Sequence, residues 1–386
     1  MKTFGIGIIG LSRRSVIIQN LPEKNVKITG AADLDPSTLK KFKKNVGHDI
    51  FLTEDYHELL KRDEIDAVFI MTRDYQHEEI TIAALEAGKA VFLEKPMAIT
   101  LESCDRILET AYRTKTKLFL GHNMRYMPFV QKMKEIIDSG VIGTIQAVWC
   151  RHFINYGGTY FRNWCSERSH TNGLLLQKGA HDIDVIHWLA GGFTQKVVGM
   201  GRLSVYDKCG RRKPDEAPDR EKAFDDSCWP PLSQDDMAPL IDIEDHNMVM
   251  LELDNRVQAS YTQCFYTPDA ERNYTFIGTH GRLENIGDTG DCEIHVWTQR
   301  GSRRNPDIIH RLKPVEGTHG GADPLIINAF IDFVKNDITP HTSPIAARNA
   351  VATGVMGHKS MRNGNIPETI PQLPAYITDY FNNGQK

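Results

Sequence analysis

The sequence has few features of a disulfide-stabilised, zinc-binding or membrane-spanning protein. Its seven cysteines are scattered and form no Cys-x-x-Cys pair, which argues against a disulfide framework or a zinc site and favours reduced thiols. No apolar run approaches the ~20 residues of a membrane-spanning helix, and the first ten residues read as a strand rather than a signal peptide. With 46 basic and 50 acidic side chains, the chain has no electrostatic preference for nucleic acid or an anionic membrane. We therefore expect a soluble, cytoplasmic protein.

What the sequence does contain is a regular alternation of strand-like and helix-like segments. A chain of 386 residues has room for two or three domains of about 150 residues each. Strand-like composition is found in six apolar runs, at residues 3–9, 26–32, 49–53, 65–72, 90–95 and 117–123, and the segments between them have helical spacing. Strands that alternate with helices of this length predict an α/β fold with a parallel, doubly wound sheet.

A glycine turn follows the first of these runs, and residues 11–21 have the spacing of a helix. A strand, a tight turn and a helix N-terminus form a site for a pyrophosphate, because free N–H groups and the helix dipole face it. The dinucleotide fingerprint expects glycines at positions 10, 12 and 15, but only Gly10 is kept and serines stand at the other two positions. Ser12 is small enough for close approach of the backbone. We expect dinucleotide contacts from Gly10, Ser12, Arg13 and Arg14.

Asp33 ends the next strand, about twenty residues after the glycine turn. A carboxylate there can accept both ribose hydroxyls of NAD and would repel the 2′-phosphate of NADP. A simpler interpretation is that Asp33 begins the turn Asp33-Leu34-Asp35-Pro36, and the two roles are compatible. Lysines at positions 40, 41, 43 and 44 fit a solvated helix face, although they keep NADP from being excluded.

The stretch at residues 90–99 joins an apolar strand to Glu94, Lys95 and a proline. Proline disfavours the α region for the preceding residue, so Lys95 should be extended just where the strand ends. The ligand crevice of an open α/β sheet lies at the carboxyl ends of the strands, which makes Lys95 a candidate for chemistry. The alternative is a solvated lysine at a strand exit. Two further strands should end at the same edge of the sheet, one followed by Thr72 and His77 and the other by Asn123, so these residues should lie near Lys95. His77 could equally be an ordinary residue in the first turn of a helix.

These motifs together resemble the glucose-fructose oxidoreductase and inositol dehydrogenase (Gfo/Idh/MocA) family. The resemblance rests on the glycine turn, Asp33, Thr72 with His77, and the runs AALEAGKAVFLEKPMA and GHNMRYMP, in this order and spacing. It extends over nearly the whole chain, and Glu94-Lys95-Pro96 is its most specific part. It implies that Lys95 lies beside the nicotinamide of NAD and the substrate, and that the Lys-Pro peptide is often cis.

A dense polar and aromatic segment at residues 157–192 carries candidate substrate residues. Gln177, His181 and Asp184 lie at i, i+4 and i+7, which places them on one helix face. Lys178 follows Gln177 and lies next to this face. A lone histidine on such a helix is more often a hydrogen-bonded core residue. The resemblance implies instead that His181 reaches the substrate hydroxyl and that Asp184 touches another hydroxyl. Many dehydrogenases of the family have aspartate where this chain has Gln177, which puts a Lys-Asp-His relay in doubt.

Other residues of the second half are also candidates for the substrate site. The resemblance matches Arg125 and His152 to substrate-contacting positions of inositol dehydrogenase-like members. A second group has no such counterpart: Arg162, Trp164, Arg168 and His170. Their clustering suits a sugar that carries a carboxylate or sulfonate, or equally a surface loop of mixed charge. No metal site is expected at His181, Asp182 and Asp184, because no second ligand cluster is visible.

The rest of the chain predicts a second domain with a large sheet. Strand-like runs joined by turn residues, typical of an antiparallel sheet, occur at residues 144–156, 246–255, 256–266, 273–285 and 293–300. Residues 207–245 are rich in proline and charge and read as an insertion or long loop that covers the site or a neighbouring subunit. Residues 324–336 and 343–364 are helical and expected to pack back across the domains.

We therefore expect two domains. Residues 1–123 form a dinucleotide-binding Rossmann domain. Residues 124–386 form a C-terminal α+β domain for substrate binding and oligomerisation, with a large open, mostly antiparallel sheet. The resemblance implies that the open face of this sheet mediates a homodimer or homotetramer.

The leading functional hypothesis is an NAD-dependent oxidoreductase that transfers hydride between nicotinamide and a secondary hydroxyl of a sugar, polyol or glycoside. Lys95 and His181 would handle the hydroxyl proton, and His181 is the better-matched base because the ordinary pKa of lysine is about 10.4. An alternative is an NAD-dependent glycoside hydrolase that works by transient oxidation, elimination, water addition and re-reduction, on a uronate or sulfonate sugar. A third hypothesis, an NAD-binding sugar-sensing regulator, is disfavoured because both Lys95 and His181 are present.

Overall fold

The computed structural model describes residues 3–11, 14–15, 21, 25–46, 49–219, 222, 227–289, 291–301, 305–315 and 318–386. The chain forms two compact units. Unit 1 comprises Met1–Tyr126, Glu316–Arg348 and Gln372–Lys386, and unit 2 comprises Met127–Val315 and Asn349–Pro371. The end of the first segment of unit 1 lies close to the expected boundary at residue 123. The two C-terminal segments, expected in the second domain, are grouped with unit 1 instead.

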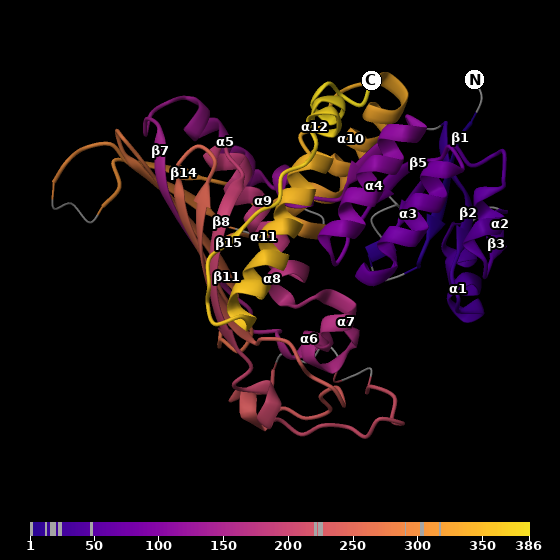
Figure 1. Ribbon diagram of the computed structural model, residues 1–386, viewed down its shortest axis with the longest axis horizontal. Coiled ribbons are helices and arrows are strands. Elements are labelled where there is room, and N and C mark those ends of the chain that lie inside the picture. The colour runs from indigo at the N-terminus through magenta and orange to yellow at the C-terminus, as the bar shows by residue number, and fades with distance from the viewer. Residues whose placement is uncertain are drawn as a thin grey trace. The chain divides into compact units, whose positions relative to one another are not determined.

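Unit 1 is built around a six-stranded sheet (Figure 1). Its strands are β1 (Phe4–Ile9), β2 (Val26–Ala32), β3 (Phe51–Thr53), β4 (Ala67–Ile70), β5 (Ala90–Leu93) and β6 (Leu118–Leu120). Their order is β3-β2-β1-β4-β5-β6, and each neighbouring pair is parallel. Every residue of β4 and β5 is buried, as expected for central strands covered on both faces. The predicted doubly wound sheet is confirmed, and its order reverses between β1 and β4, where ligands bind in such folds.

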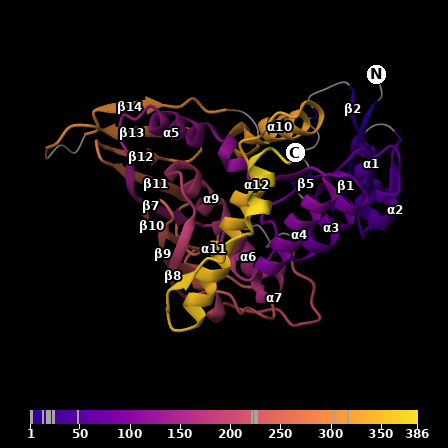
Figure 2. The ribbon, with the colours of Figure 1, turned by 45° about the horizontal axis from the view of Figure 1, so that its top comes forward.

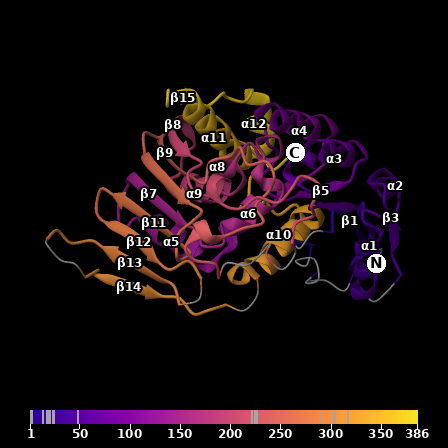
Figure 3. The ribbon, with the colours of Figure 1, turned by 90° about the horizontal axis from the view of Figure 1, so that it is seen from below.

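Helices from both ends of the chain cover this sheet. They are α1 (Pro36–Val46), α2 (Tyr56–Leu60), α3 (His77–Glu86), α4 (Leu101–Thr114), α10 (Ala322–Asn336) and α12 (Ala375–Asn382). Figures 2 and 3 show α10 on the side of the sheet opposite α3 and α4. Phe330 of α10 makes edge-on contacts with Phe69, Phe92 and Phe119 of β4, β5 and β6, at ring-centroid distances of 5.0, 5.6 and 5.5 Å. These contacts explain why α10 belongs to unit 1.

Unit 2 contains a nine-stranded sheet in the order β14-β13-β12-β11-β7-β10-β9-β8-β15. Its strands are β7 (Ile145–Phe153), β8 (Thr194–Arg202), β9 (His246–Leu253), β10 (Gln258–Cys264), β11 (Glu271–Gly278), β12 (Arg282–Ile286), β13 (Glu293–Trp297), β14 (Ile308–Arg311) and β15 (Glu368–Thr369). The pair β7 and β10 is parallel, and the other pairs are antiparallel. The predicted open, mostly antiparallel sheet is therefore confirmed.

One face of this sheet is covered by helices. The helices of unit 2 are α5 (Pro128–Asp138), α6 (Gly158–Arg162), α7 (Arg168–Thr171), α8 (Leu174–Gln177) and α9 (Gly179–Ala190), and α11 (Pro344–Arg362) begins in unit 1 and continues into unit 2. Figure 2 shows α5 and α9 along the sheet. Strands alternate buried and exposed positions, and the exposed ones include Trp149, Met200, Met248 and Met250.

The segment at residues 207–245 is irregular, as its composition indicates. Its described part has a short 3₁₀ turn at Pro231–Ser233 and one bridge between Arg211 and Met237. It is nevertheless packed, because Met237 is fully buried in a cluster with Phe161 and Phe265. The described part of the segment is thus packed into the core of unit 2.

Candidate active site

The turn after β1 approaches the exit of β4 closely. Gly10 has φ +87°, and a Cβ atom there would lie 2.8 Å from Cγ2 of Thr72 and 2.9 Å from its backbone nitrogen. Only glycine allows this backbone conformation together with this approach. The predicted cofactor residues Ser12 and Arg13, and most of the helix expected after the turn, lie outside the described residues.

Asp33 joins the end of β2 to this turn. Its Oδ2 accepts a hydrogen bond from the backbone nitrogen of Leu11 at 2.7 Å, and its Oδ1 accepts one from the nitrogen of Asp35 at 2.9 Å. The second bond is the turn role considered from the sequence. The first places the carboxylate beside the glycine turn, where a ribose contact requires it.

His77 fixes the segment that follows β5. The Lys95–Pro96 peptide is cis, and the Nδ1 of His77 lies 2.7 Å from the carbonyl oxygen of Pro96. The side chain is fully buried, and burial lowers the pKa of His77, so the ring is neutral and donates through Nδ1. His77 therefore positions the Lys95 segment, which is a structural role.

Arg14 connects Glu94 to the C-terminal part of unit 1. Its Nε donates to Oε1 of Glu94 at 2.6 Å, and its Nη1 donates to Oδ1 of Asp323 at 2.8 Å. Asp323 is fully buried at the start of α10, and the Nδ2 of Asn123 lies 3.4 Å from the same Oδ1. No local pattern in the sequence marks Asp323, because 309 residues separate it from Arg14 and 200 residues separate it from Asn123.

Two buried oxygen atoms at this edge have no hydrogen-bond partner among the described residues: Oγ1 of Thr72 and Oδ1 of Asn123. An unpaired buried polar atom is costly, so such atoms point to a ligand that satisfies them. They follow β4 and β6, at the edge that carries the Gly10 turn and Lys95. These residues fit a dinucleotide with polar groups along the carboxyl ends of the strands. Arg125 is also in unit 1, is buried, and donates from Nη1 to the carbonyl oxygen of His341 at 2.5 Å.

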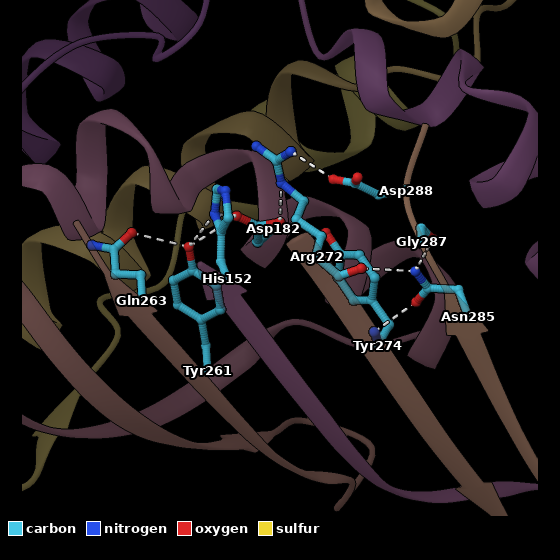
Figure 4. Close-up of polar contacts among 9 residues, drawn as sticks. All are labelled: His152, Asp182, Tyr261, Gln263, Arg272, Tyr274, Asn285, Gly287 and Asp288. Atoms are coloured by element: carbon cyan, nitrogen blue, oxygen red, sulfur yellow. Dashed lines mark hydrogen bonds and ion pairs between the residues drawn. The ribbon is translucent and has the colours of Figure 1, made fainter. Parts of the chain in front are cut away.

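Unit 2 contains a buried polar cluster around Asp182 (Figure 4). This carboxylate is fully buried and accepts hydrogen bonds from His152 at 2.9 Å, Tyr261 at 2.8 Å, Arg272 at 3.0 Å, and Tyr274. Burial alone would raise the pKa of Asp182, but these partners hold it far below its usual range. Asp182 is therefore a permanent anion that fixes the side chains around it.

From the sequence, His152 was predicted as a substrate residue, but the cluster around it was not. Asp182 was considered only as a metal ligand, and Arg272 and Tyr274, which lie two residues apart on one face of β11, were not selected. Arg272 also donates from Nη1 to Oδ2 of Asp288 at 3.2 Å. A possible signal was the presence of a charged and a hydroxylated residue at i and i+2 on a strand with a buried face.

His152 takes one defined tautomer in this cluster. Burial and the nearby Arg272 lower the pKa of His152 to about 3, so the ring is neutral near pH 7. Its Nδ1 then carries the proton donated to Asp182, and Nε2 is a hydrogen-bond acceptor. This arrangement suits a substrate hydroxyl that donates to His152.

Because the pKa of His152 falls to about 3 on folding, from about 6.5 in the unfolded chain, the unfolded chain binds more protons between these values. The free energy of unfolding should therefore fall as the pH falls from about 6.5 towards 3, by up to about 1.4 kcal/mol per pH unit. Urea unfolding of His152→Gln at several pH values should show a smaller slope. The exposed His57 gives the control, His57→Gln. An unchanged slope in His152→Gln would contradict the assignment.

The expected single helix through Gln177 and His181 is divided. Gln177 ends α8 and Gly179 begins α9, with Lys178 between them at φ −101°. A Cβ at Gly179 would lie 3.0 Å from Cε1 of Tyr261, so the chain passes close to β10 at this point. Gln177, Lys178 and His181 are half-buried and Asp184 is buried.

The arginine cluster considered for an anionic sugar binds the 207–245 segment. Arg162 is buried and contacts the carbonyl oxygen of Asp235 at 3.1 Å and Oε1 of Gln234 at 3.2 Å. Arg168 donates from its backbone nitrogen to Asp242 and pairs with Glu244 at 3.7 Å. The remaining members are Trp164, which packs against the core cluster, and His170, whose ring contacts the carbonyl oxygen of Trp164.

None of the seven cysteines, all of which lie among the described residues, forms a disulfide bond. Within the described ranges, no three or more histidine, cysteine, aspartate or glutamate side chains are grouped to hold a metal ion. In that same part of the chain, no helix has both the length and the apolar character needed to cross a bilayer.

Two family models match the chain. The NAD-binding Rossmann fold of the Gfo/Idh/MocA oxidoreductases matches residues 4–122, and the C-terminal alpha/beta domain of the same family matches residues 134–370. The chain belongs to the Gfo/Idh/MocA oxidoreductase family. The resemblance seen in the sequence is thereby confirmed, and the Gly10 turn, Asp33 and Lys95 all lie within the NAD-binding match.

Similarity to individual Gfo/Idh/MocA proteins is modest. The chain is 27% identical over 374 residues to the putative oxidoreductase YteT of Bacillus subtilis, covering 82% of this chain and 86% of that one. It is 31% identical over 186 residues to an inositol 2-dehydrogenase/D-chiro-inositol 3-dehydrogenase of Lactiplantibacillus plantarum, covering 48% and 50%. The fold is similar to scyllo-inositol dehydrogenase from Lactobacillus casei with bound NAD(H) and scyllo-inositol, with a TM-score of 0.72, 21% identity, and coverage of 96% and 99%.

Proposed function

We propose that this protein is an NAD-dependent dehydrogenase that oxidises a secondary hydroxyl of a neutral sugar, polyol or glycoside. The observation that carries this proposal is the position of Lys95, which follows β5 at the sheet edge that also bears the Gly10 turn and the unpaired oxygens of Thr72 and Asn123. Relatives named as inositol dehydrogenases support a polyol-like substrate. We propose a neutral substrate because Arg162 and Arg168, which were considered as partners of an anionic sugar, bind the 207–245 segment instead.

The residues of unit 1 would hold NAD. The backbone at Gly10 would face the pyrophosphate, and Asp33 would accept hydrogen bonds from the ribose hydroxyls, which would favour NAD over NADP. When bound, NAD accepts a hydride. Lys95 donates a hydrogen bond to the oxygen of the reacting hydroxyl and stabilises the charge that develops on it.

The residues of unit 2 would bind the substrate. His181 contacts the reacting hydroxyl, and the Nε2 of His152 accepts a hydrogen bond from a neighbouring one. Asp182 does not react, because its hydrogen bonds to His152, Tyr261, Arg272 and Tyr274 hold it as a structural anion. Asp184 remains a further candidate for a hydroxyl contact, as does Arg125, which belongs to unit 1.

A second candidate function is redox-assisted glycoside cleavage. Gln177 carries no basic group at a position where the family resemblance implies aspartate, while the adjacent Lys178 adds a titratable group. Elimination from an oxidised sugar needs such an additional acid–base group.

A substrate panel tests the proposal. Purified protein with NAD is incubated with cyclic polyols, hexoses, uronates and nitrophenyl glycosides, and both NADH and released nitrophenol are measured. We expect one NADH per substrate oxidised, with neutral polyols or sugars preferred over uronates. Release of nitrophenol without accumulation of NADH would support the glycosidase. A sugar that raises the melting temperature only with NAD present, without turnover, would support a regulator and contradict both enzymatic functions.

A further inference from the structure

Lys178 occupies an unusual position for a lysine. It is half-buried at the junction of α8 and α9, three residues before His181. Its Nζ lies 5.4 Å from the ring centroid of Tyr156 and 5.8 Å from that of Tyr160. The side chain is thus directed into unit 2, beside the polar cluster, rather than into solvent.

The groups around Lys178 include a second, permanently charged cation. Arg272 lies nearby on β11 and is held there by Asp182 and Asp288. Both carboxylates are therefore already paired with the guanidinium of Arg272. The titratable and charged groups that face Lys178 come from β7, α6 and the loop before it, α9, β11 and the loop after β12: His152, Tyr156, Tyr160, Asp182, Arg272 and Asp288. Burial and the like charge of Arg272 lower the pKa of Lys178 to about 7.

The other groups of this cluster are poor proton acceptors near neutral pH. Asp182 is a weak base because its partners hold its pKa far below the usual range. His152 is a weak base for a similar reason, with a pKa of about 3. Gln177 has no basic group. Lys178 is the neighbouring side chain whose neutral form is available near pH 7, where general bases work best.

We propose that Lys178 is a further catalytic residue, which accepts the hydroxyl proton when the substrate is oxidised. This inference rests on the proposed dehydrogenase function. The hydroxyl O–H bond breaks and an N–H bond forms on Nζ of Lys178, which becomes an ammonium. The electron pair of the C–H bond leaves with the hydride to the nicotinamide of NAD, and a C=O bond remains. His181 then orients the hydroxyl by a hydrogen bond.

The pH dependence of kcat/KM tests this assignment. The unmodified enzyme should lose activity as the pH falls through about 7. Lys178→Met and Lys178→Arg should both lower kcat/KM by about 10²–10⁴-fold and lack this limb, because arginine keeps the charge but does not accept a proton. Lys178→Arg with normal kcat and an unchanged limb would overturn the proposal. The exposed Lys196 gives the control, Lys196→Met, which should keep the normal profile.

His181 requires its own control, because the ordinary pKa of histidine is about 6.5. His181→Gln should lower kcat/KM but keep the limb near pH 7. A limb that disappears in His181→Gln and persists in Lys178→Arg would assign the proton to His181 and overturn the proposal.

Competitive acetylation, followed by mass spectrometry across pH, measures the amine without turnover. We expect Lys178 to reach half-maximal reactivity near pH 7, against about 10.4 for an ordinary lysine. Half-maximal reactivity near the ordinary value would overturn the proposal even in an active enzyme. If no substrate of the panel is turned over while Lys178 still reacts with a midpoint near 7, the failure lies in the proposed function and the catalytic role falls with it.

Discussion

Lys95→Met is expected to lower kcat/KM by roughly 10³-fold or more while NAD binding is nearly unchanged. The ammonium of Lys95 follows β5 at the edge that carries the cofactor candidates, and in the proposed reaction it stabilises the oxygen that loses its proton. Methionine keeps most of the apolar length of the side chain, so the fold should be unaffected. Turnover is measured by NADH formation, and NAD affinity by isothermal titration calorimetry.

The control for this variant is Lys43→Met. Lys43 is exposed on α1 and pairs with Asp49. The Lys43→Met substitution should therefore leave turnover and NAD affinity unchanged. Near-normal turnover in Lys95→Met would remove Lys95 from the chemistry and return it to the solvated-lysine interpretation. Loss of NAD affinity as the main effect would make it a cofactor-binding residue instead.

Asp182→Asn should destabilise unit 2 by about 3–5 kcal/mol, because Arg272 and its neighbours lose a buried partner charge. Asparagine has nearly the shape of aspartate, but its amide nitrogen faces groups that are themselves donors. The variant also removes the acceptor that sets the tautomer of His152, so activity should fall even where the protein remains folded. Urea unfolding measures the stability, and NADH formation measures the activity.

Two further variants separate charge from packing. Asp138→Asn breaks an exposed pair with Lys134 on α5 and should change stability by less than about 1 kcal/mol. The double variant Asp182→Asn/Arg272→Met removes both charges and should recover part of the stability lost in the single variant. A double variant that is simply additive would show that the two charges do not stabilise one another.

Local patterns in the sequence were sufficient for much of the fold. The expected strand at residues 26–32 is the observed β2, and the order of strands and helices predicted the parallel sheet. Alternation and apolar runs are local signals, and a central strand shows them regardless of its partners. The same signals located the strand exits with Thr72, Lys95 and Asn123.

The polar partners of the candidate site could not be predicted in this way. Asp323 pairs with Arg14 across about three hundred residues of sequence, and Arg272 on β11 pairs with Asp182 on α9 across 90 residues. Such pairings depend on tertiary packing and have no local period. The division between α8 and α9 was missed for the same reason, because the close approach of Gly179 to Tyr261 is a contact between distant segments.

The packing of Phe330 against β4, β5 and β6 has a consequence for biosynthesis. The first six strands leave the ribosome long before α10 does, so one side of their sheet lacks this helix while most of unit 2 is being translated. Contacts of such large sequence separation slow folding and prolong the exposure of apolar surface. The apolar face of the nascent sheet that Phe330 covers in the folded protein therefore stays without this helix until the last part of the chain has emerged.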